Sequence, residues 1–244
     1  MIREIGVVVP AANEENHLAD CLRSLLASRD RLSCTRSHRV RVRIILVLDG
    51  CRDGSADIAA GFAGVETIGV DAGCAGAARR AGTTLQLRGG TPAGELWLAN
   101  TDADSLVPAN WLTGMLDEAA RGAHLVLGTV TPGPGLSSEA MREWCLRHVV
   151  QEGHPHVHGA NFGIRADVYS ALGGWQALAC GEDDALAARA ASAGHLRIAR
   201  TARIPVVTST RLQARAPDGF SSYLRELVTP IDQRTHEQLR IEVA

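Results

Sequence analysis

The sequence predicts an α/β fold in which a mostly parallel sheet is flanked by helices within a single domain. Short apolar runs alternate with segments whose apolar residues recur at helical spacing, the pattern of repeated strand–helix units. The length of 244 residues suits one large domain. Apolar residues make up 45% and charged residues 21% of the chain, which excludes a fully disordered chain, a collagen and a coiled coil.

The first half of the chain carries the most regular pattern. Its apolar runs predict buried strands over residues 5–9, 42–48, 65–70, 95–99 and 125–130. Its helices are expected after Asn13 and over residues 53–62, 73–87 and 108–122. The first of these helices has one apolar face, formed by Leu18, Leu22 and Leu25. Pro108 suits the first turn of the helix over 108–122. Segment 30–41 is rich in arginine and aperiodic, so it predicts a loop.

The second half is less regular. Helices are expected over residues 137–151, 167–173, 182–193 and 220–228, and strands over residues 196–199 and 204–207. Segment 153–164 is rich in histidine and glycine, which predicts an active-site loop with a short strand. Residues 208–219 predict another loop, and the chain from 231 onward is a polar tail.

Polar residues follow the first, second and fourth expected strands. In open α/β sheets, ligands bind beyond the carboxyl ends of the strands. The predicted topology therefore gathers one set of side chains along a single edge of the sheet. These are Asn13, Glu14, Asp49, Asp53, Asp102 and Asp104.

Composition narrows the class of protein. A net charge of -2 and a pI near 6.5 argue against a dedicated nucleic-acid binder. No apolar run is long enough for a transmembrane helix, and the N-terminus lacks the features of a signal peptide, so a cytoplasmic protein is expected. Every basic residue is arginine, which excludes lysine Schiff-base chemistry and a P-loop lysine. The six cysteines form no C-x-x-C pair, so most are expected to be small buried residues.

Asp102 and Asp104 form an Asp-x-Asp pair at the end of an expected strand. In an extended backbone, residues two apart point the same way, so both carboxylates can share one hard cation such as Mg²⁺ or Mn²⁺. Short acidic turns are common, but this one lies on the same predicted edge as Asp49. Two roles are open for Asp49. It belongs to a turn before a capped helix, or it accepts hydrogen bonds from a nucleobase, and one residue can do both.

Arg79 lies early in the expected third helix, where its guanidinium can meet a diphosphate or an acidic cluster. Neighbouring Arg80 is better explained as a solvated helix residue. Gly73 and Gly76 do not have the spacing of a dinucleotide fingerprint.

Glu182, Asp183 and Asp184 open an expected helix. Helix starts attract acidic residues, but three carboxylates in a row exceed what capping needs. Their mutual repulsion is expected to raise the pKa of at least one of them, which suits a general base.

His154, His156 and His158 alternate along the 153–164 loop. Pro155 and the flanking glycines favour a substrate-binding loop over a zinc site, with an ordinary surface loop as the remaining alternative.

Taken together, these motifs resemble the family 2 glycosyltransferases of GT-A fold over roughly residues 5–207. Their joint order and spacing are more specific than any one of them. The matching segments are Val-Val-Pro-Ala-Ala-Asn-Glu-Glu (8–15), Val-Leu-Asp-Gly-Cys-Arg-Asp-Gly-Ser (47–55), Ala-Ala-Arg-Arg-Ala-Gly (77–82), Thr-Asp-Ala-Asp-Ser (101–105), Gly-Ala-Asn-Phe-Gly-Ile-Arg (159–165), Gly-Gly-Trp (173–175) and Gly-Glu-Asp-Asp (181–184).

The resemblance implies inverting transfer of a sugar from a nucleotide diphosphate sugar to a small-molecule or glycan-like acceptor. It implies residues 1–105 as the nucleotide-sugar-binding half, 106–230 as the acceptor-binding half, and 231–244 as a tail. The implied donor-binding residues are Pro10, Ala11, Asn13, Glu14 (or Glu15 in its place), Asp49, Arg79 and Asp102. Asp102 and Asp104 are the implied ligands of Mn²⁺ or Mg²⁺. His158, Asn161 and Trp175 are implied on the acceptor side, and Asp183, with Glu182, in catalysis.

The sequence departs from the family pattern in one region. Some relatives place a histidine after the last core strand as a further metal ligand, but here residues 208–211 read Thr-Ser-Thr-Arg. Without this histidine we expect weaker metal binding, or a site in which Arg211 supplies charge in place of the histidine ligand. The alternatives to a glycosyltransferase are a nucleotidyltransferase and a non-catalytic nucleotide-sugar-binding module. The acidic segment 11–16 speaks against the first, and Asp183 against the second.

Overall fold

A computed structural model describes residues 1–35, 40–211 and 224. The chain forms two compact units, one of residues 1–131 and 150–208 and the other of residues 132–149 and 209–244. The expected helix over 220–228 (apart from Leu224), the domain end at residue 230 and the tail over 231–244 lie outside the described residues. In the described part of the chain, no helix combines the length and apolarity needed to span a membrane.

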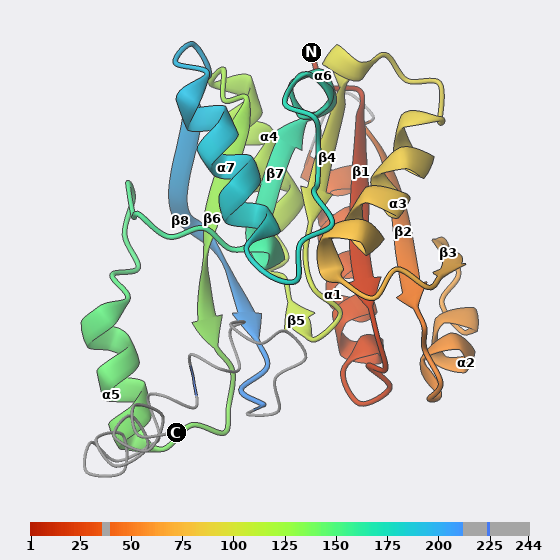
Figure 1. Ribbon diagram of the computed structural model, residues 1–244, viewed down its shortest axis with the longest axis vertical. Coiled ribbons are helices and arrows are strands. Elements are labelled where there is room, and N and C mark those ends of the chain that lie inside the picture. The colour runs from red at the N-terminus through yellow and green to blue at the C-terminus, as the bar shows by residue number, and fades with distance from the viewer. Residues whose placement is uncertain (36–39, 212–223, 225–244) are drawn as a thin grey trace, which may run out of the picture. The chain divides into compact units, whose positions relative to one another are not determined.

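The sheet of the first unit has the strand order β3-β2-β1-β4-β7-β6-β8-β5. β1 pairs in parallel with β2 and β4, and β2 with β3, whereas β7 runs antiparallel to β4 and β6 (Figure 1). This arrangement confirms the predicted α/β fold. The strands are β1 (Glu4–Ala11), β2 (Arg41–Asp49), β3 (Val65–Val70), β4 (Leu96–Asn100), β5 (Ser105–Leu106), β6 (Leu125–Pro132), β7 (Phe162–Arg165) and β8 (Ile198–Thr208).

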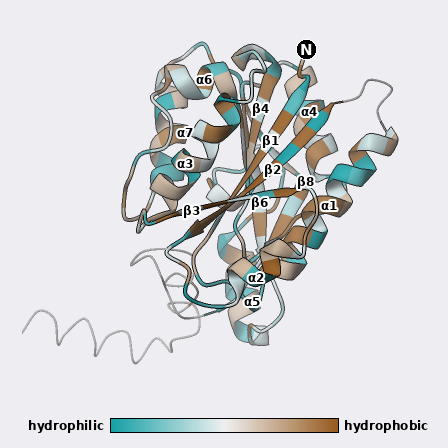
Figure 2. Cartoon of the chain, turned by 90° about the vertical axis from the view of Figure 1, so that its right-hand side faces the viewer, coloured by the Kyte–Doolittle hydropathy of each residue, from teal (hydrophilic) through white to brown (hydrophobic). Residues whose placement is uncertain are grey.

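Helices cover both faces of the sheet because alternate strand residues point to opposite sides. Val7 packs in one core with residues of α1 and α4, whereas Val8 packs against Ala78 of α3 on the other face. Leu98 on that second face lies in a core with residues of α6 and α7. Figure 2 shows hydrophobic residues concentrated along β1 and β2. The helices are α1 (Leu18–Thr35), α2 (Ser55–Ala60), α3 (Ala75–Leu87), α4 (Trp111–Ala120), α6 (Ala166–Ala171), α7 (Glu182–Ser192) and, in the second unit, α5 (Ser138–Arg147).

The structure corrects several predicted boundaries. The helix expected over residues 137–151 is α5, which already ends at Arg147. α1 continues to Thr35 through the segment expected to be a loop, because Ser28 and Leu32 extend its buried stripe while arginines occupy the exposed face. β8 is one continuous strand where two were expected, because buried Thr201 continues the pattern toward Ile204. The two-residue strand β5, which pairs with the end of β8, was not predicted.

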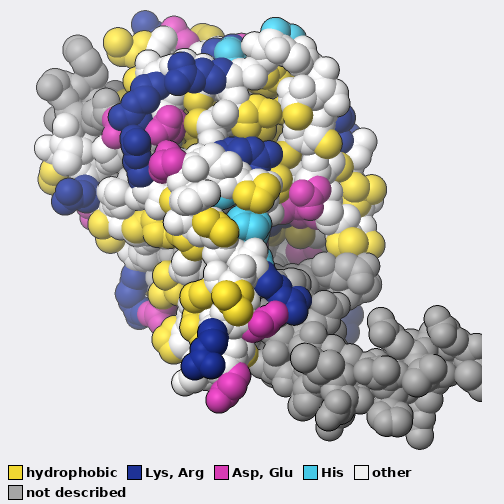
Figure 3. Space-filling view, turned by 90° about the vertical axis from the view of Figure 1, so that its left-hand side faces the viewer, with side chains coloured by type: hydrophobic (Ala, Val, Ile, Leu, Met, Phe, Trp, Pro, Cys, Tyr) yellow, Lys and Arg dark blue, Asp and Glu magenta, His cyan; other side chains and the backbone are white. Residues whose placement is uncertain are grey.

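Charge is mixed on the face that Figure 3 presents. Acidic side chains there lie next to the basic ones, including the arc of basic side chains in the upper part of the view. This distribution accords with the net charge of -2.

Candidate functional site

The loops that follow β1 and β2 are joined by hydrogen bonds. Asn13 adopts the left-handed conformation, with φ of 55°, and its Oδ1 accepts a hydrogen bond of 2.7 Å from the Arg52 amide. The Glu14 amide donates to Ser55 Oγ at 2.9 Å. Asn13 thus shapes the loop that begins directly after the Pro10 and Ala11 end of β1. The structure places these predicted donor-side residues together at the carboxyl end of the sheet.

The two glutamates of this loop have different surroundings. The Glu14 side chain is buried, whereas Glu15 is exposed and its Oε2 accepts a hydrogen bond of 2.8 Å from the Gly54 amide. The Glu15 amide also donates to Asp53 Oδ2 at 2.9 Å. Glu15 therefore ties two loops together, and Glu14 is the glutamate that points toward the interior.

Asp49 supports the loop between β3 and α3. Its Oδ1 accepts hydrogen bonds from the amides of Ala72 at 2.6 Å and Gly73 at 3.1 Å. Both bonds use the same oxygen of the carboxylate. Asp49 thus fixes the loop between β3 and α3. The residue itself lies at the edge of the sheet for which a nucleobase contact was predicted.

Asp102 and Asp104 follow β4, as predicted. Asp102 is 35% exposed, and Asp104 Oδ1 accepts a hydrogen bond of 3.3 Å from Ser105 Oγ. The thiol of Cys21 is buried, and its Sγ donates a hydrogen bond to the backbone carbonyl of Asp102 at 3.4 Å. Burial raises the pKa of this thiol strongly, and the charges of Asp104, Asp102 and Glu14 raise it further. Cys21 therefore lies beneath the acidic edge of the sheet as a buried, neutral thiol.

The same two carboxylates, Asp102 and Asp104, are the predicted metal ligands. Within residues 1–35, 40–211 and 224, no three His, Cys, Asp or Glu side chains are arranged to hold a metal ion. Mg²⁺ in nucleotide sites is commonly held by one or two carboxylates, with substrate phosphates and waters as its other ligands. Asp102 and Asp104 supply two carboxylates after the end of β4 for that mode of binding, and the described residues form no cage made wholly of protein ligands.

Arg79 lies at the centre of the acidic edge. This α3 residue is only 3% exposed, and its guanidinium donates to the carboxylates of Asp102 and Glu182. The ring of Trp175 faces the guanidinium, with 5.5 Å between the ring centroid and Cζ. Burial opposes the charged form, but the Asp102 and Glu182 carboxylates outweigh it, so the pKa of Arg79 is raised.

The acidic helix start is the N-terminus of α7, as predicted. Asp183 Oδ2 accepts a hydrogen bond of 2.6 Å from the Gly159 amide, and Asp183 Oδ1 accepts one of 3.0 Å from the Asp184 amide. The pKa values of Glu182 and Asp184 are both raised, first by burial and then by effects that include the charge of Asp183. The first cause of both rises is burial rather than the mutual repulsion that the sequence predicted, and repulsion from Asp183 adds to it.

Asn161 and Trp175 lie in the interior. Asn161 is fully buried, and its amide accepts from Trp111 Nε1 at 2.9 Å and donates to the carbonyls of Thr129 and Ile204 at 2.9 and 2.7 Å. Trp175 is 1% exposed. Both side chains are therefore buried within the protein and present no surface to an acceptor, in contrast to the predicted direct contact.

The sequence analysis treated Gly159 only as a flank of the histidine loop, whereas the structure places it against both Arg79 and Asp183. A side chain at this position would put its Cβ 2.6 Å from Arg79 Nη2. The available signal was the glycine itself, two residues before Asn161 in the Gly-Ala-Asn-Phe-Gly-Ile-Arg segment.

The histidine loop is held by Arg200. Its Nη1 donates to the carbonyls of His154, Pro155 and His156 at 3.2, 2.8 and 3.1 Å. The rings of His154, His156 and His158 stack at centroid distances of 5.8 and 6.0 Å. Stacked rings do not converge on a point, so this geometry favours a substrate loop or a surface loop over a zinc site.

Acidification is expected to destabilise the protein through His154. Its Nε2 lies 3.2 Å from the Leu127 carbonyl, and the residue is buried. Burial lowers the pKa of His154 below its unfolded value, so stability should fall as pH drops below about 6.5. Thermal unfolding between about pH 7.5 and about pH 5.5 measures this slope. His154→Gln should flatten it, and an unchanged slope would show that other groups are responsible.

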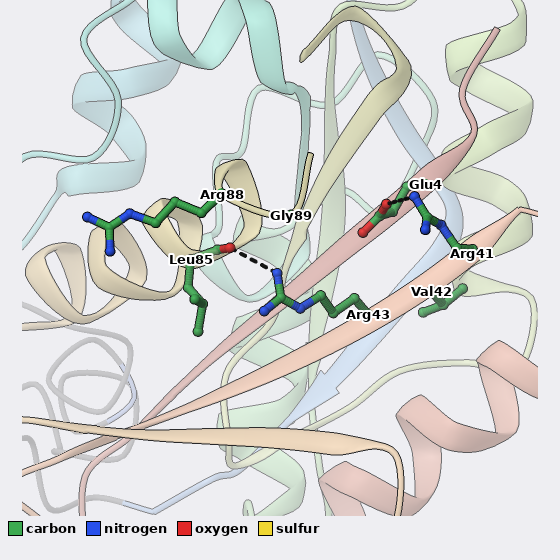
Figure 4. A pocket seen from close by; sticks show the side chains of 7 residues that line it. All are labelled: Glu4, Arg41, Val42, Arg43, Leu85, Arg88 and Gly89. Atoms are coloured by element: carbon green, nitrogen blue, oxygen red, sulfur yellow. Dashed lines mark hydrogen bonds and ion pairs between the residues drawn. The ribbon is translucent and has the colours of Figure 1, made fainter. Parts of the chain in front are cut away.

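A separate pocket of about 390 Å³ lies at the other edge of the sheet, where β1 and β2 begin (Figure 4). Arg41 there donates to Glu4 at 2.8 Å, and Arg43 to the Leu85 carbonyl at 2.9 Å. Ligands of such sheets bind at the carboxyl ends of the strands, so this pocket is not the predicted site. Its lining residues are Glu4, Arg41, Val42, Arg43, Leu85, Arg88 and Gly89.

Comparison with known proteins gives a family match and several similar folds. The sequence model described as "Glycosyl transferase family 2" matches residues 6–173. No curated protein matches the chain in sequence. S. aureus TarS 1-349, solved in complex with UDP-GlcNAc, is 14% identical at a TM-score of 0.62, and the match covers 89% of this chain. The chain spans 61% of the length of that TarS chain.

Further solved structures share the fold. The mannosyltransferase PcManGT from Pyrobaculum calidifontis, in complex with GDP-Man and Mn²⁺, is 18% identical at a TM-score of 0.60 and covers 90% of this chain and 59% of its own. Glucosyl-3-phosphoglycerate synthase from Mycobacterium tuberculosis, in complex with Mg²⁺ and UDP, is 16% identical at a TM-score of 0.53, with 85% and 70% covered. These likenesses confirm the GT-A fold.

Proposed function

Because the chain belongs to glycosyl transferase family 2, we propose that it transfers a sugar, with inversion, from a nucleotide diphosphate sugar to a hydroxyl group of an acceptor. The observation that carries the proposal is the arrangement around Arg79. This one guanidinium contacts Asp102 at the end of β4 and Glu182 beside Asp183. Donor-side and base-side carboxylates thus lie around one buried cation.

The donor side consists of the loops after β1, β2 and β4. We assign the nucleoside to Pro10, Ala11, Glu14 and Asp49, with Asn13 shaping the first loop through its hydrogen bond to Arg52. Asp102 and Asp104 would hold Mn²⁺ or Mg²⁺. When bound, the cation would stabilise the negative charge that develops on the departing diphosphate.

Asp183 is the proposed general base. Its carboxylate takes the proton from the acceptor hydroxyl while that oxygen forms a bond to the anomeric carbon. The bond from that carbon to the diphosphate oxygen breaks, and the electron pair leaves with the diphosphate. A single displacement inverts the configuration and needs no enzyme nucleophile. The Gly159 amide fixes Oδ2 of the base at 2.6 Å.

The acceptor side is assigned to the loop of His158, with Asn161 and Trp175 as its buried support. Asn161 joins Trp111 of α4 to the carbonyls of Thr129 and Ile204, so it fixes the floor beneath this loop. We therefore propose a supporting role for these two side chains and direct acceptor contact for His158.

The proposal is tested first by donor binding. UDP, GDP and other nucleoside diphosphates, each with and without Mn²⁺, are compared by thermal shift. A nucleotide at 100 times its Kd stabilises the native state by about 2.7 kcal/mol, which raises Tm by about 5–10 °C in a chain of this size. Consumption of the corresponding sugar nucleotide with and without acceptor then separates an enzyme from a binding module. No shift with any nucleotide would contradict the proposal.

A further inference from the structure

We infer that Arg79 and Glu182 are positioning residues that couple the donor side of the site to the proposed base. Arg79 holds Asp102 at the end of β4 and, through Glu182, the first turn of α7 that carries Asp183. The catalytic consequence rests on the proposed function, whereas the coupling itself is a property of the fold.

The burial of Arg79 and Glu182 is the reason for assigning them a positioning role. The side chains of Arg79 and Glu182 are 4% and 8% exposed, so neither presents a surface to a donor or an acceptor. Asp102, which is 35% exposed, is the member of the group that can meet a ligand. Arg79 therefore acts on the donor through Asp102 rather than by direct contact with phosphate.

A second path runs from Arg79 to the base through Gly159. A Cβ at this position would lie 2.6 Å, 2.8 Å and 2.9 Å from Nη2, Cζ and Nη1 of Arg79, so the Gly159 backbone lies directly against the guanidinium. The amide of the same residue donates to Asp183 Oδ2. A displacement of Arg79 would thus move both the helix turn that bears Asp183 and the amide that orients its carboxylate.

The guanidinium has little room to move. Trp175 covers it on one side, and the Trp175 ring is itself packed against Phe162 and Tyr169 at centroid distances of 4.9 and 6.4 Å. Around Glu182 the packing is equally close. A Cβ at Gly76 would lie 3.1 Å from Glu182 Cβ. The Arg79–Glu182 pair therefore fixes α7 against α3 in one position.

Glu182→Gln tests the inference. Glutamine keeps the shape and an acceptor oxygen for Arg79 but removes the charge that holds the pair together. We expect kcat to fall at least tenfold, Kd for UDP and GDP with Mn²⁺ to change less than threefold, and amide exchange at Gly159 to accelerate at least tenfold. Wild-type kcat, or unchanged exchange at Gly159, would overturn the inference.

Two further variants keep the test decisive. If Glu182→Gln does not fold, Arg79→Met combined with Glu182→Met removes both buried charges, a change that buried ion pairs often tolerate, and the same faster exchange at Gly159 is expected. Arg43→Met with Glu66→Met removes an ion pair between β2 and β3 and should leave both readouts unchanged. If the wild type transfers no sugar, the proposed function fails, while exchange at Gly159 still decides the coupling.

Discussion

Asp183→Asn is expected to lower kcat by about 100- to 10,000-fold, the range associated with loss of a general base. Asparagine has nearly the same shape and its Oδ1 can still accept the hydrogen bond from the Gly159 amide. It cannot take a proton from the acceptor hydroxyl. The variant should therefore keep its fold and its affinity for the nucleotide, and lose turnover.

The measurement combines steady-state transfer with direct titration of UDP and GDP in the presence of Mn²⁺. Asp184→Asn is the matched control, because Asp184 is the next carboxylate of α7 and donates its amide to Asp183. We expect Asp184→Asn to retain most of the activity. A collapse of nucleotide affinity in Asp183→Asn, or a larger loss of kcat in Asp184→Asn, would show that the base is assigned to the wrong residue.

Local pattern was sufficient for most of the fold. The strand predicted over residues 65–70 coincides with β3, and the helix predicted over 182–193 differs from α7 by one residue. Such segments have a clear apolar period of their own. β5 has only two residues and pairs with β8 across about a hundred residues of sequence, so no local pattern marks it. α1 was predicted too short because its arginines masked the buried stripe through Leu32.

The candidate site, like the fold, could be predicted from the sequence only in part. Parallel strands bring their carboxyl ends to one edge, so Asp49 and Asp102 could be placed together from topology alone. The burial of Arg79 between Asp102 and Glu182 could not, because these residues are brought together only by packing of α3 against α7. Asn161 seemed available to a ligand for a related reason. Its partners, the Trp111 indole and two backbone carbonyls, are distant in sequence.

Asp104→Ala is expected to reduce turnover by about 100- to 10,000-fold, which corresponds to a loss of about 3–5 kcal/mol of transition-state stabilisation from the proposed cation. The fold should persist, because Asp104 follows the end of β4 and lies outside the apolar core. In the wild type, Mn²⁺ should tighten binding of UDP or GDP, and EDTA should abolish that gain. In Asp104→Ala, Mn²⁺ should have no effect on nucleotide affinity.

Thermal unfolding provides the check on stability, and Asp20→Ala provides the control. Asp20 lies in the first turn of α1 and pairs on the surface with Arg23, so its loss should change neither turnover nor the effect of Mn²⁺. If Asp104→Ala keeps both wild-type turnover and a response to Mn²⁺, the Asp-x-Asp pair does not hold the cation. A loss of turnover accompanied by a large fall in Tm would instead assign Asp104 to the stability of the β4–β5 turn, where its carboxylate accepts from Ser105.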